Sequence, residues 1–189
     1  MKSVDGNEHI ELRTGKLPLG VDRITRTLQV IDYSHHEIHA GSHFMYTDHQ
    51  VIANGASGDA YLITVPNSTK WPHMWFDLDG SAITDFLLYE GADRVGTTPQ
   101  TVGNSNRNSD TAATMLVHKG TSGGTTDGTL LHRHKGGSAT NQSRAGMNTG
   151  NNEEIILKQN TKYLLRAISG TDANLVNIKL EWYEHANKS

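Results

Sequence analysis

The sequence has 189 residues, enough for one ordinary domain, of which 20% are charged and 35% apolar. Its 17 Lys and Arg against 20 Asp and Glu give a net charge of −3, which argues against a nucleic-acid binder that relies on neutralising phosphates. Cysteine is absent, which excludes disulfides, thiolate zinc sites and cysteine catalysis, and the apolar runs are too short to span a membrane.

The N-terminal residues 1–23 are polar and show no usable periodicity, so we expect a flexible arm. This arm is either a frayed terminus or a segment that docks on a neighbour. It has no apolar signal core, which favours synthesis and retention in the cytosol. From Ile24 to Asp32 the chain is rich in β-branched residues, which favours a strand, and an alternation of period two over Tyr33–His39 predicts that the extended chain continues to Gly41.

Short strands separated by turns are predicted through the middle of the chain. Turns are expected at Asn54-Gly55 and Ser57–Asp59, where turn-forming residues gather. Strands are expected over Ala60–Val65, around Met74–Phe76, and over Ala82–Tyr89. Because both faces of this last strand carry large apolar groups, it should be covered on both sides.

The second half of the chain alternates between loops and strands. Residues 91–110 are almost bare of apolar side chains and predict a loop or a short exposed hairpin. Strands are expected over Thr111–His118 and Gly128–His134, around a turn at Lys119–Gly124, before a second long loop over residues 136–152. Three further strands close the chain, at 155–157, 163–168 and 175–183. The last has an apolar inner face formed by Val176, Ile178, Leu180 and Trp182.

No stretch of the sequence has a convincing helical period with caps. Short strands at irregular spacing with turn signals between them are typical of an all-β sandwich or jelly roll. We therefore predict an all-β protein with a jelly-roll-like β-sandwich as a single domain over residues 24–189, preceded by the arm at residues 1–23.

The histidines are the first candidates for metal chemistry. His35, Glu37 and His39 share one face of the expected strand and His43 lies just beyond it, and imidazole with carboxylate can bind a borderline metal. Three residues spaced along a strand lie too far apart to bind one ion. The stronger interpretation is that these side chains lie on a half-exposed strand face or in a subunit contact.

A second pair, His132 and His134, has the H-x-H spacing of cupin-type metalloenzymes. Those proteins place a glutamate four to five residues later, where this chain has Ser138 and Ala139. The cupin pattern therefore fails at its third ligand.

Other catalytic patterns are missing. Gly120–Gly123 does not match the G-x-S-x-G turn of serine hydrolases, and the phosphate-binding glycine patterns are absent. The carboxylate pairs Asp77/Asp79 and Glu153/Glu154 lie at expected strand ends, where solvated turn residues are typical. Buried packing is expected for Trp75 and Trp182. We assign no catalytic, cofactor-binding or metal residues and do not expect an enzyme.

Several segments, in order along about 150 residues, resemble a family of virion structural proteins of tailed bacteriophages. They are His36–Gly41 with His43-Phe44, Leu88–Ala92, Asn104–Ser109 with Thr111-Ala112, Gly128–Leu131, Asn160–Arg166 and Trp182–Glu184. The resemblance implies a head decoration, or cement, protein that binds major capsid subunits and stabilises the head. It also implies a homotrimer of jelly-roll-like sandwiches on the capsid surface, assembled in the host cytoplasm, with no nucleic-acid or membrane partner and no cofactor.

Two other functions stay open on the residues alone. A tail- or fibre-associated module that binds host-surface glycan would use exposed aromatic side chains, and Trp71 is the obvious candidate. A metal-dependent, cupin-like enzyme would use the cluster from His35 to His43, or His132 and His134. In the loop at Asn106–Asn108, Arg107 either anchors an interface or belongs to a local Asx turn.

Overall fold

The computed structural model describes residues 13–14, 17–18, 33–138, 145–148 and 154–186. The chain divides into two compact units, Met1–His36 and Glu37–Ser189. In the first unit, β1 (Arg13–Thr14) pairs antiparallel with β2 (Leu17–Pro18). The rest of the predicted arm at residues 1–23, its boundary, and the strand predicted over residues 24–32 lie outside the described residues.

The segment predicted as an extension of that strand is a helix, α1 (Tyr33–His39). Its C-terminus explains why the prediction was wrong. Gly41 adopts φ 71°, its N–H donates to the carbonyl of Ile38 at 3.0 Å, and the N–H of Ser42 donates to the carbonyl of Glu37 at 3.0 Å. This pair of bonds around a left-handed glycine is the Schellman motif that ends helices. Gly41 therefore stops a helix, and the alternation of His and Glu before it was not the apolar alternation of a strand.

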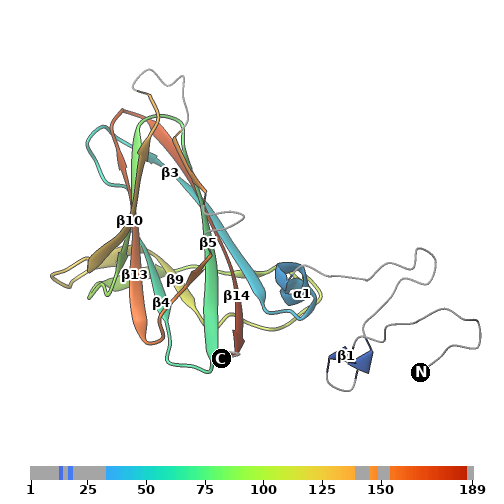
Figure 1. Cartoon of the computed structure of the whole chain (residues 1–189). Helices are drawn as coiled ribbons and strands as arrows, with labels where there is room; N and C mark the ends of the chain where they lie inside the picture. The colour runs from blue at the N-terminus through green and yellow to red at the C-terminus, as the bar shows by residue number, and fades with distance from the viewer. Residues whose placement is uncertain (1–12, 15–16, 19–32, 139–144, 149–153, 187–189) are drawn as a thin grey trace, which may run out of the picture. The chain divides into compact units, whose positions relative to one another are not determined.

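The strands of the second unit form two antiparallel sheets that pack face to face, which confirms the predicted all-β sandwich (Figure 1). The first, called here the β6 sheet, has the order β10 (Thr129–Gly136), β6 (Thr84–Glu90), β13 (Thr161–Ser169), β4 (Tyr61–Val65), β9 (Leu116–Ser122) and β7 (Val95–Pro99). The second, called the β5 sheet, has the order β11 (Ala145–Asn148), β5 (Lys70–Gly80), β14 (Asn174–Ala186), β3 (His43–Ile52) and β8 (Gly103–Asn104), and β12 (Ile155–Ile156) also pairs with β5.

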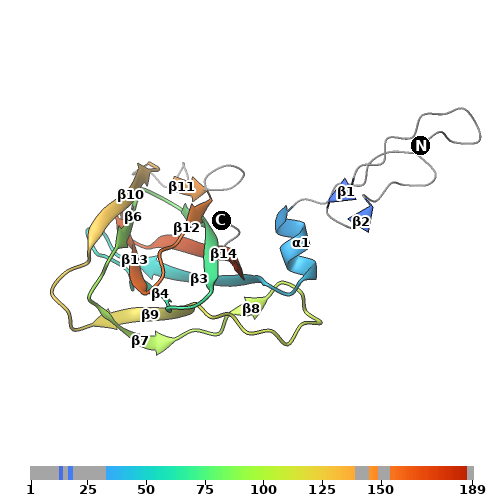
Figure 2. The same cartoon turned by 60° about the horizontal axis from the view of Figure 1, so that its bottom comes forward.

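From β3 to β6, each strand lies in the sheet opposite to that of the strand before it. β3 and β5 belong to the β5 sheet, whereas β4 and β6 belong to the β6 sheet, and the same exchange recurs from β10 to β14. In the turned view the two sheets stand as opposite walls of the sandwich (Figure 2).

The core lies between the two sheets and follows the predicted alternation. On β14, Val176, Ile178, Leu180 and Trp182 are buried, while the residues between them are exposed or half-buried. On β6, residues 84–88 are all buried, as expected for a strand covered on both faces. A second, smaller apolar cluster of Ala60, Leu62, Ala92 and Leu164 packs on the outer side of the β6 sheet. Within the described ranges, no helix is long and apolar enough to cross a membrane.

Three stretches predicted as turn or loop contain strands. Residues 119–122, predicted as part of a turn, belong to β9, because β9 pairs with β4 on one side and β7 on the other. At its other end, β9 begins at Leu116, so the first five residues of the strand predicted over Thr111–His118 are not in a strand. In the region predicted as a loop or exposed hairpin, β7 is exposed but pairs with β9 rather than with a hairpin partner. Residues 145–148 form β11 on the edge of β5.

Candidate binding surface

The outer face of the β5 sheet carries the side chains that do not enter the core. Because side chains alternate along a strand, residues paired across β3, β14 and β5 form rows on this face. His43, Tyr183 and His73 form one row. Further along, Thr47, Lys179 and Asp77 form another, followed by His49, Asn177 and Asp79. One end of the face is thus aromatic and the other polar.

At the aromatic end, six rings from three strands lie together. We call them the aromatic patch: Trp71, His73 and Trp75 of β5, Tyr183 and His185 of β14, and His43 of β3. The His73 ring stacks on Tyr183 with centroids 4.7 Å apart and lies 4.5 Å from the ring of His185. Trp75 lies 5.3 Å from Tyr183 and 6.3 Å from His43. Ring contacts join five of the six rings, and Trp71 lies opposite His185 in the strand register. Tyr183 and His43 are buried and the other four residues are half-buried, so part of the patch meets solvent.

Glu154 fixes the centre of the patch. The Tyr183 hydroxyl donates to Glu154 Oε1 at 2.8 Å, and the same oxygen pairs with Nδ1 of His73. Burial lowers the pKa of His43, although the nearby carboxylates of Glu181 and Glu37 act in the opposite direction. Two exposed apolar side chains, Met45 at 36% and Ile156 at 50% exposure, lie beside the patch in the strand register, opposite Glu181 and His73.

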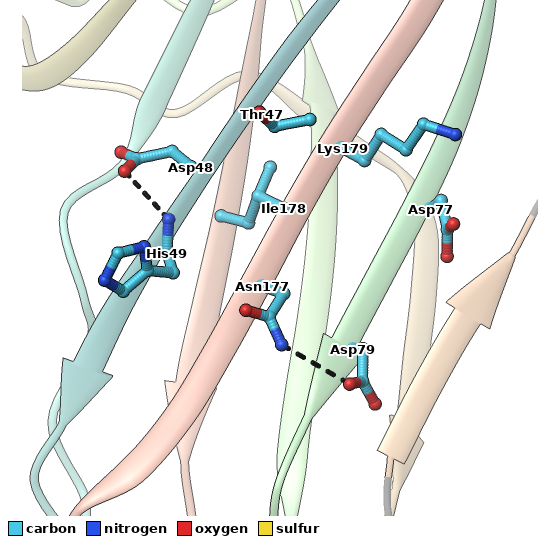
Figure 3. A pocket seen from close by; sticks show the side chains of 8 residues that line it. All are labelled: Thr47, Asp48, His49, Asp77, Asp79, Asn177, Ile178 and Lys179. Carbon is cyan, nitrogen blue, oxygen red and sulfur yellow. Dashed lines mark hydrogen bonds between the residues drawn. The ribbon is translucent and has the colours of Figure 1, made fainter.

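At the polar end of the same face lies a hollow of about 430 Å³. We call it the outer-face hollow; it is lined by Thr47, Asp48, His49, Asp77, Asp79, Asn177, Ile178 and Lys179. Figure 3 shows these side chains spread over three neighbouring strands, with the Asn177 amide donating to Asp79 Oδ2 at 3.4 Å. Lys179 Nζ pairs with Glu181 at 2.9 Å.

Three predictions from the sequence concern side chains of β5 and β14, and two of them are wrong. Trp182 is buried as predicted, but Trp75 is half-buried on the outer face, because Met74 and Phe76 on either side of it point into the core. Asp77 and Asp79 are not turn residues at a strand end. They lie within β5 and line the outer-face hollow.

The candidate metal ligands do not come together as the sequence suggested. His35, Glu37 and His39 lie on helix α1, so they do not share a strand face, and Glu37 is buried and accepts a hydrogen bond from the Ser42 hydroxyl. His132 and His134 lie on the edge strand β10, paired with Leu88 and Phe86 of β6. Among the described residues, no group of three or more His, Asp or Glu side chains is placed to hold a metal ion.

Comparison with family models, with curated protein sequences and with solved structures finds no match to this chain. The site must therefore be interpreted from its own chemistry.

Several carboxylates of the sandwich hold neighbouring segments in place. Asp48 accepts hydrogen bonds from the Tyr61 hydroxyl at 2.7 Å and from Lys119 Nζ at 2.7 Å. Burial acts to raise the pKa of Asp48, but the bonds from Lys119 and Tyr61 outweigh it and lower that pKa. Asp93 accepts bonds from the backbone N–H groups of Thr125 and Thr126, which lower its pKa and fix the turn before β10.

Asp127, in the same turn, accepts hydrogen bonds from Arg94 at 2.8 Å and Arg166 at 3.0 Å. These contacts are structural: Asp48 links β3 to β4 and β9, Asp93 links two loops, and Asp127 links its loop to Arg94 of another loop and to Arg166 of β13.

The loop at Asn106–Asn108 adopts the local conformation that the sequence left open as one of two alternatives. The Asn104 side chain accepts from the Asn106 N–H at 2.8 Å, and the Asn106 side chain accepts from the Asn108 N–H at 3.1 Å, which are Asx turns. Arg107 is exposed and donates to the carbonyl of Asn104 at 3.2 Å. The Asn106 amide donates to the carbonyl of His39, which ties the loop to the end of α1.

Proposed function

We propose that the protein is a virion structural protein of a tailed bacteriophage, of the head-decoration type, which stabilises the head by binding major capsid subunits. The aromatic patch is the observation that carries this proposal, because it offers a built binding surface. Trp and Tyr are enriched at the centres of protein interfaces, where they supply most of the binding energy. Five of the six rings, all except that of Trp71, are held in place by ring contacts with one another, and Glu154 bonds to two of them, so little side-chain entropy is lost when a partner covers them.

The proposal describes a protein that works by binding rather than by turnover. The carboxylates Asp48, Asp93, Asp127 and Glu184 accept hydrogen bonds that hold loops and strands together. A sandwich braced in this way is suited to repeated contacts on a symmetric shell, where modest interfaces add up over many copies.

We further infer that the sandwich is a jelly roll. In such a fold, strands that follow one another alternate between two four-stranded sheets. The orders β3-β14-β5-β11 and β4-β13-β6-β10 support this inference, with β7, β8 and β9 as an insertion between β6 and β10. Double-sheet jelly rolls occur in viral capsid proteins and in lectins, an analogy of fold that is compatible with the proposal but does not by itself establish it.

The resemblance in sequence adds the expectation of a homotrimer on the capsid surface. Light scattering on the purified full chain measures the mass directly. A trimer supports the decoration role, whereas a monomer that ignores capsids contradicts it.

The binding proposal is tested by mixing the protein with heads of the encoding phage that have been stripped of accessory proteins, then counting bound copies after sedimentation. We expect saturable binding. Trp71→Ala should weaken it roughly tenfold or more, because a tryptophan that a partner covers commonly contributes that much to binding. Leu130→Ala, which truncates an exposed side chain on β10 at the edge of the other sheet, is the matched control and should bind as the wild type does.

The two possible failures are distinct. A wild-type chain that does not bind stripped heads contradicts the function. Wild-type binding that survives Trp71→Ala and His185→Ala, in variants whose melting temperature is unchanged, contradicts the assignment of the patch.

A further inference from the structure

We infer that the outer-face hollow binds a neutral saccharide. This inference goes beyond the decoration role, because it assigns a second ligand to the polar end of the same sheet face, next to the aromatic patch, from which it takes only Trp75. It rests on three features of the hollow: its size and regular lining, its mixture of donors and acceptors, and the tryptophan at its end.

The lining is a grid set by the strand register. Thr47, Lys179 and Asp77 form one row across β3, β14 and β5, and His49, Asn177 and Asp79 form the next. From ordinary strand spacing the grid measures roughly 10 Å by 7 Å. With a volume of about 430 Å³, the hollow falls in the range of small-ligand sites, and its open, shallow form suits one or two sugar rings lying flat.

The chemistry of the grid matches hydroxyl groups, which both donate and accept hydrogen bonds. The carboxylates of Asp77 and Asp79 accept, Lys179 donates, and Asn177, Thr47 and His49 can do both. Among the residues that the structure describes, the side chains of Asp77, Thr47 and His49 have no hydrogen-bond or ion-pair partner, so their capacity is open to a ligand.

Charge selects among saccharides. Of the two carboxylates in the grid, Asp77 has no ion-pair partner among the described residues, and Lys179 is already paired with Glu181. An acidic sugar would meet these carboxylates at close range and be repelled. The hollow therefore favours a sugar without acidic groups.

Trp75 supplies the apolar contact that sugar binding requires. It lies two residues before Asp77 on the same face of β5, which places it in the row beside the hollow. It is half-buried, so part of its indole meets solvent. A sugar ring whose hydroxyls reach Asp77 can lay its C–H face against this indole, which adds burial of apolar surface to the hydrogen bonds.

The experiment is a titration of the ¹⁵N-labelled full chain with neutral trisaccharides built from glucose, galactose, mannose and N-acetylglucosamine, followed by NMR. The chain has three tryptophans, and Trp→Phe variants assign their three indole signals. We expect the Trp75 indole and the amides of residues 47–49, 77–79 and 177–179 to shift saturably with at least one sugar. Trp182, fully buried with its indole donating to Glu184, is the internal control and should not shift.

Variants give the same test independently of the assignment of the NMR signals. Asp77→Asn should weaken binding roughly ten- to hundredfold, as expected for loss of a hydrogen bond to a charged acceptor. Asp110→Asn, at an exposed aspartate on another segment, should leave affinity unchanged.

Three outcomes would each overturn the inference. They are the absence of a saturable shift with any trisaccharide, equal affinity of the Asp77→Asn and Asp110→Asn variants, and equally tight binding of an acidic trisaccharide such as sialyllactose. Because Asp77 lies outside the aromatic patch, head binding should survive Asp77→Asn, so failure of this inference is distinguishable from failure of the decoration role.

Discussion

Glu184 is a single buried side chain on which a whole segment depends. Its carboxylate, 1% exposed, accepts hydrogen bonds from the backbone N–H and hydroxyl of Thr114, from the N–H of Met115 and from the Trp182 indole. The segment before β9 therefore takes its backbone partners from a side chain of β14 instead of from a neighbouring strand. A buried charge is tolerated because these donors replace its water.

We predict that Glu184→Gln lowers the free energy of unfolding by about 2–4 kcal/mol. The NH₂ group of the glutamine amide cannot accept a hydrogen bond, so it would leave some of the N–H and O–H donors around it without an acceptor. Urea unfolding measures the effect. Glu181→Gln, on the same strand but half-exposed and paired with Lys179, is the control and should cost less than about 1 kcal/mol. Equal losses in the two variants would contradict the role given to Glu184.

His43 predicts a dependence of stability on pH. Burial lowers its pKa in the folded protein, while in the unfolded chain it titrates near pH 6.5. The unfolded state therefore binds a proton more readily than the folded state. The contribution of His43 is intact above about pH 6.5 and is lost as the pH falls through the folded-state pKa.

Accordingly, the free energy of unfolding should fall more steeply between pH 7 and pH 5 in the wild type than in His43→Gln. Chemical unfolding at several pH values measures both slopes, and His49→Gln, which removes an exposed histidine from the same strand, is the control for loss of an imidazole. Identical slopes in wild type and His43→Gln would refute this account.

At the scale of elements, the entry into β10 depends on close backbone packing. Gly128 has φ 97°, and a methyl group on it would lie 2.2 Å from the carbonyl oxygen of Glu90, at the end of β6. Gly55 also has a positive φ, of 70°, but a methyl group there would meet open space. An alanine at Gly55 would therefore test backbone strain alone, whereas an alanine at Gly128 would add a steric clash.

We predict that Gly55→Ala lowers the free energy of unfolding by about 1 kcal/mol, through backbone strain alone, and that Gly128→Ala costs about 2–4 kcal/mol because β10 must also shift from β6. Thermal unfolding gives the totals, and hydrogen exchange should show faster opening of β10 amides in Gly128→Ala. Similar costs for both variants would mean that the clash is absorbed without displacing β10.

The elements that the sequence predicts correctly are those with apolar alternation. β14 has it, and β4 and β6 go further, because they carry large apolar residues on both faces. Helix α1 was missed because its alternation was between polar residues, although Gly41 was available as a helix stop signal. The extent of β9 was missed because it depends on partners, β4 and β7, that no local pattern reveals.

The candidate surface was visible in part. Trp71, His73 and Trp75 alternate in the sequence, and so do Tyr183 and His185, so strict application of period two puts each set on one face of its own strand. What the sequence does not contain is the pairing of β5 with β14, which brings these residues and Asp77 with Asn177 onto one surface.

At the scale of the whole molecule, the two faces of the β5 sheet differ. Its inner face packs in the core, and its outer face carries the candidate binding surface. The rings of the aromatic patch and the grid of the outer-face hollow occupy successive rows of the same three strands. Variants of Trp71 and Asp77 therefore probe two sites on a common scaffold, and the melting temperature of each variant shows whether the scaffold itself has changed.

The central claim is that binding of this protein stabilises a phage head. The measurement that tests it most directly is the melting temperature of stripped heads, recorded with saturating wild-type protein and with the Trp71→Ala variant. We predict that the wild-type protein raises the melting temperature of the heads and that Trp71→Ala, at the same concentration, raises it much less. A head melting temperature that does not change on addition of the wild-type protein would contradict the account.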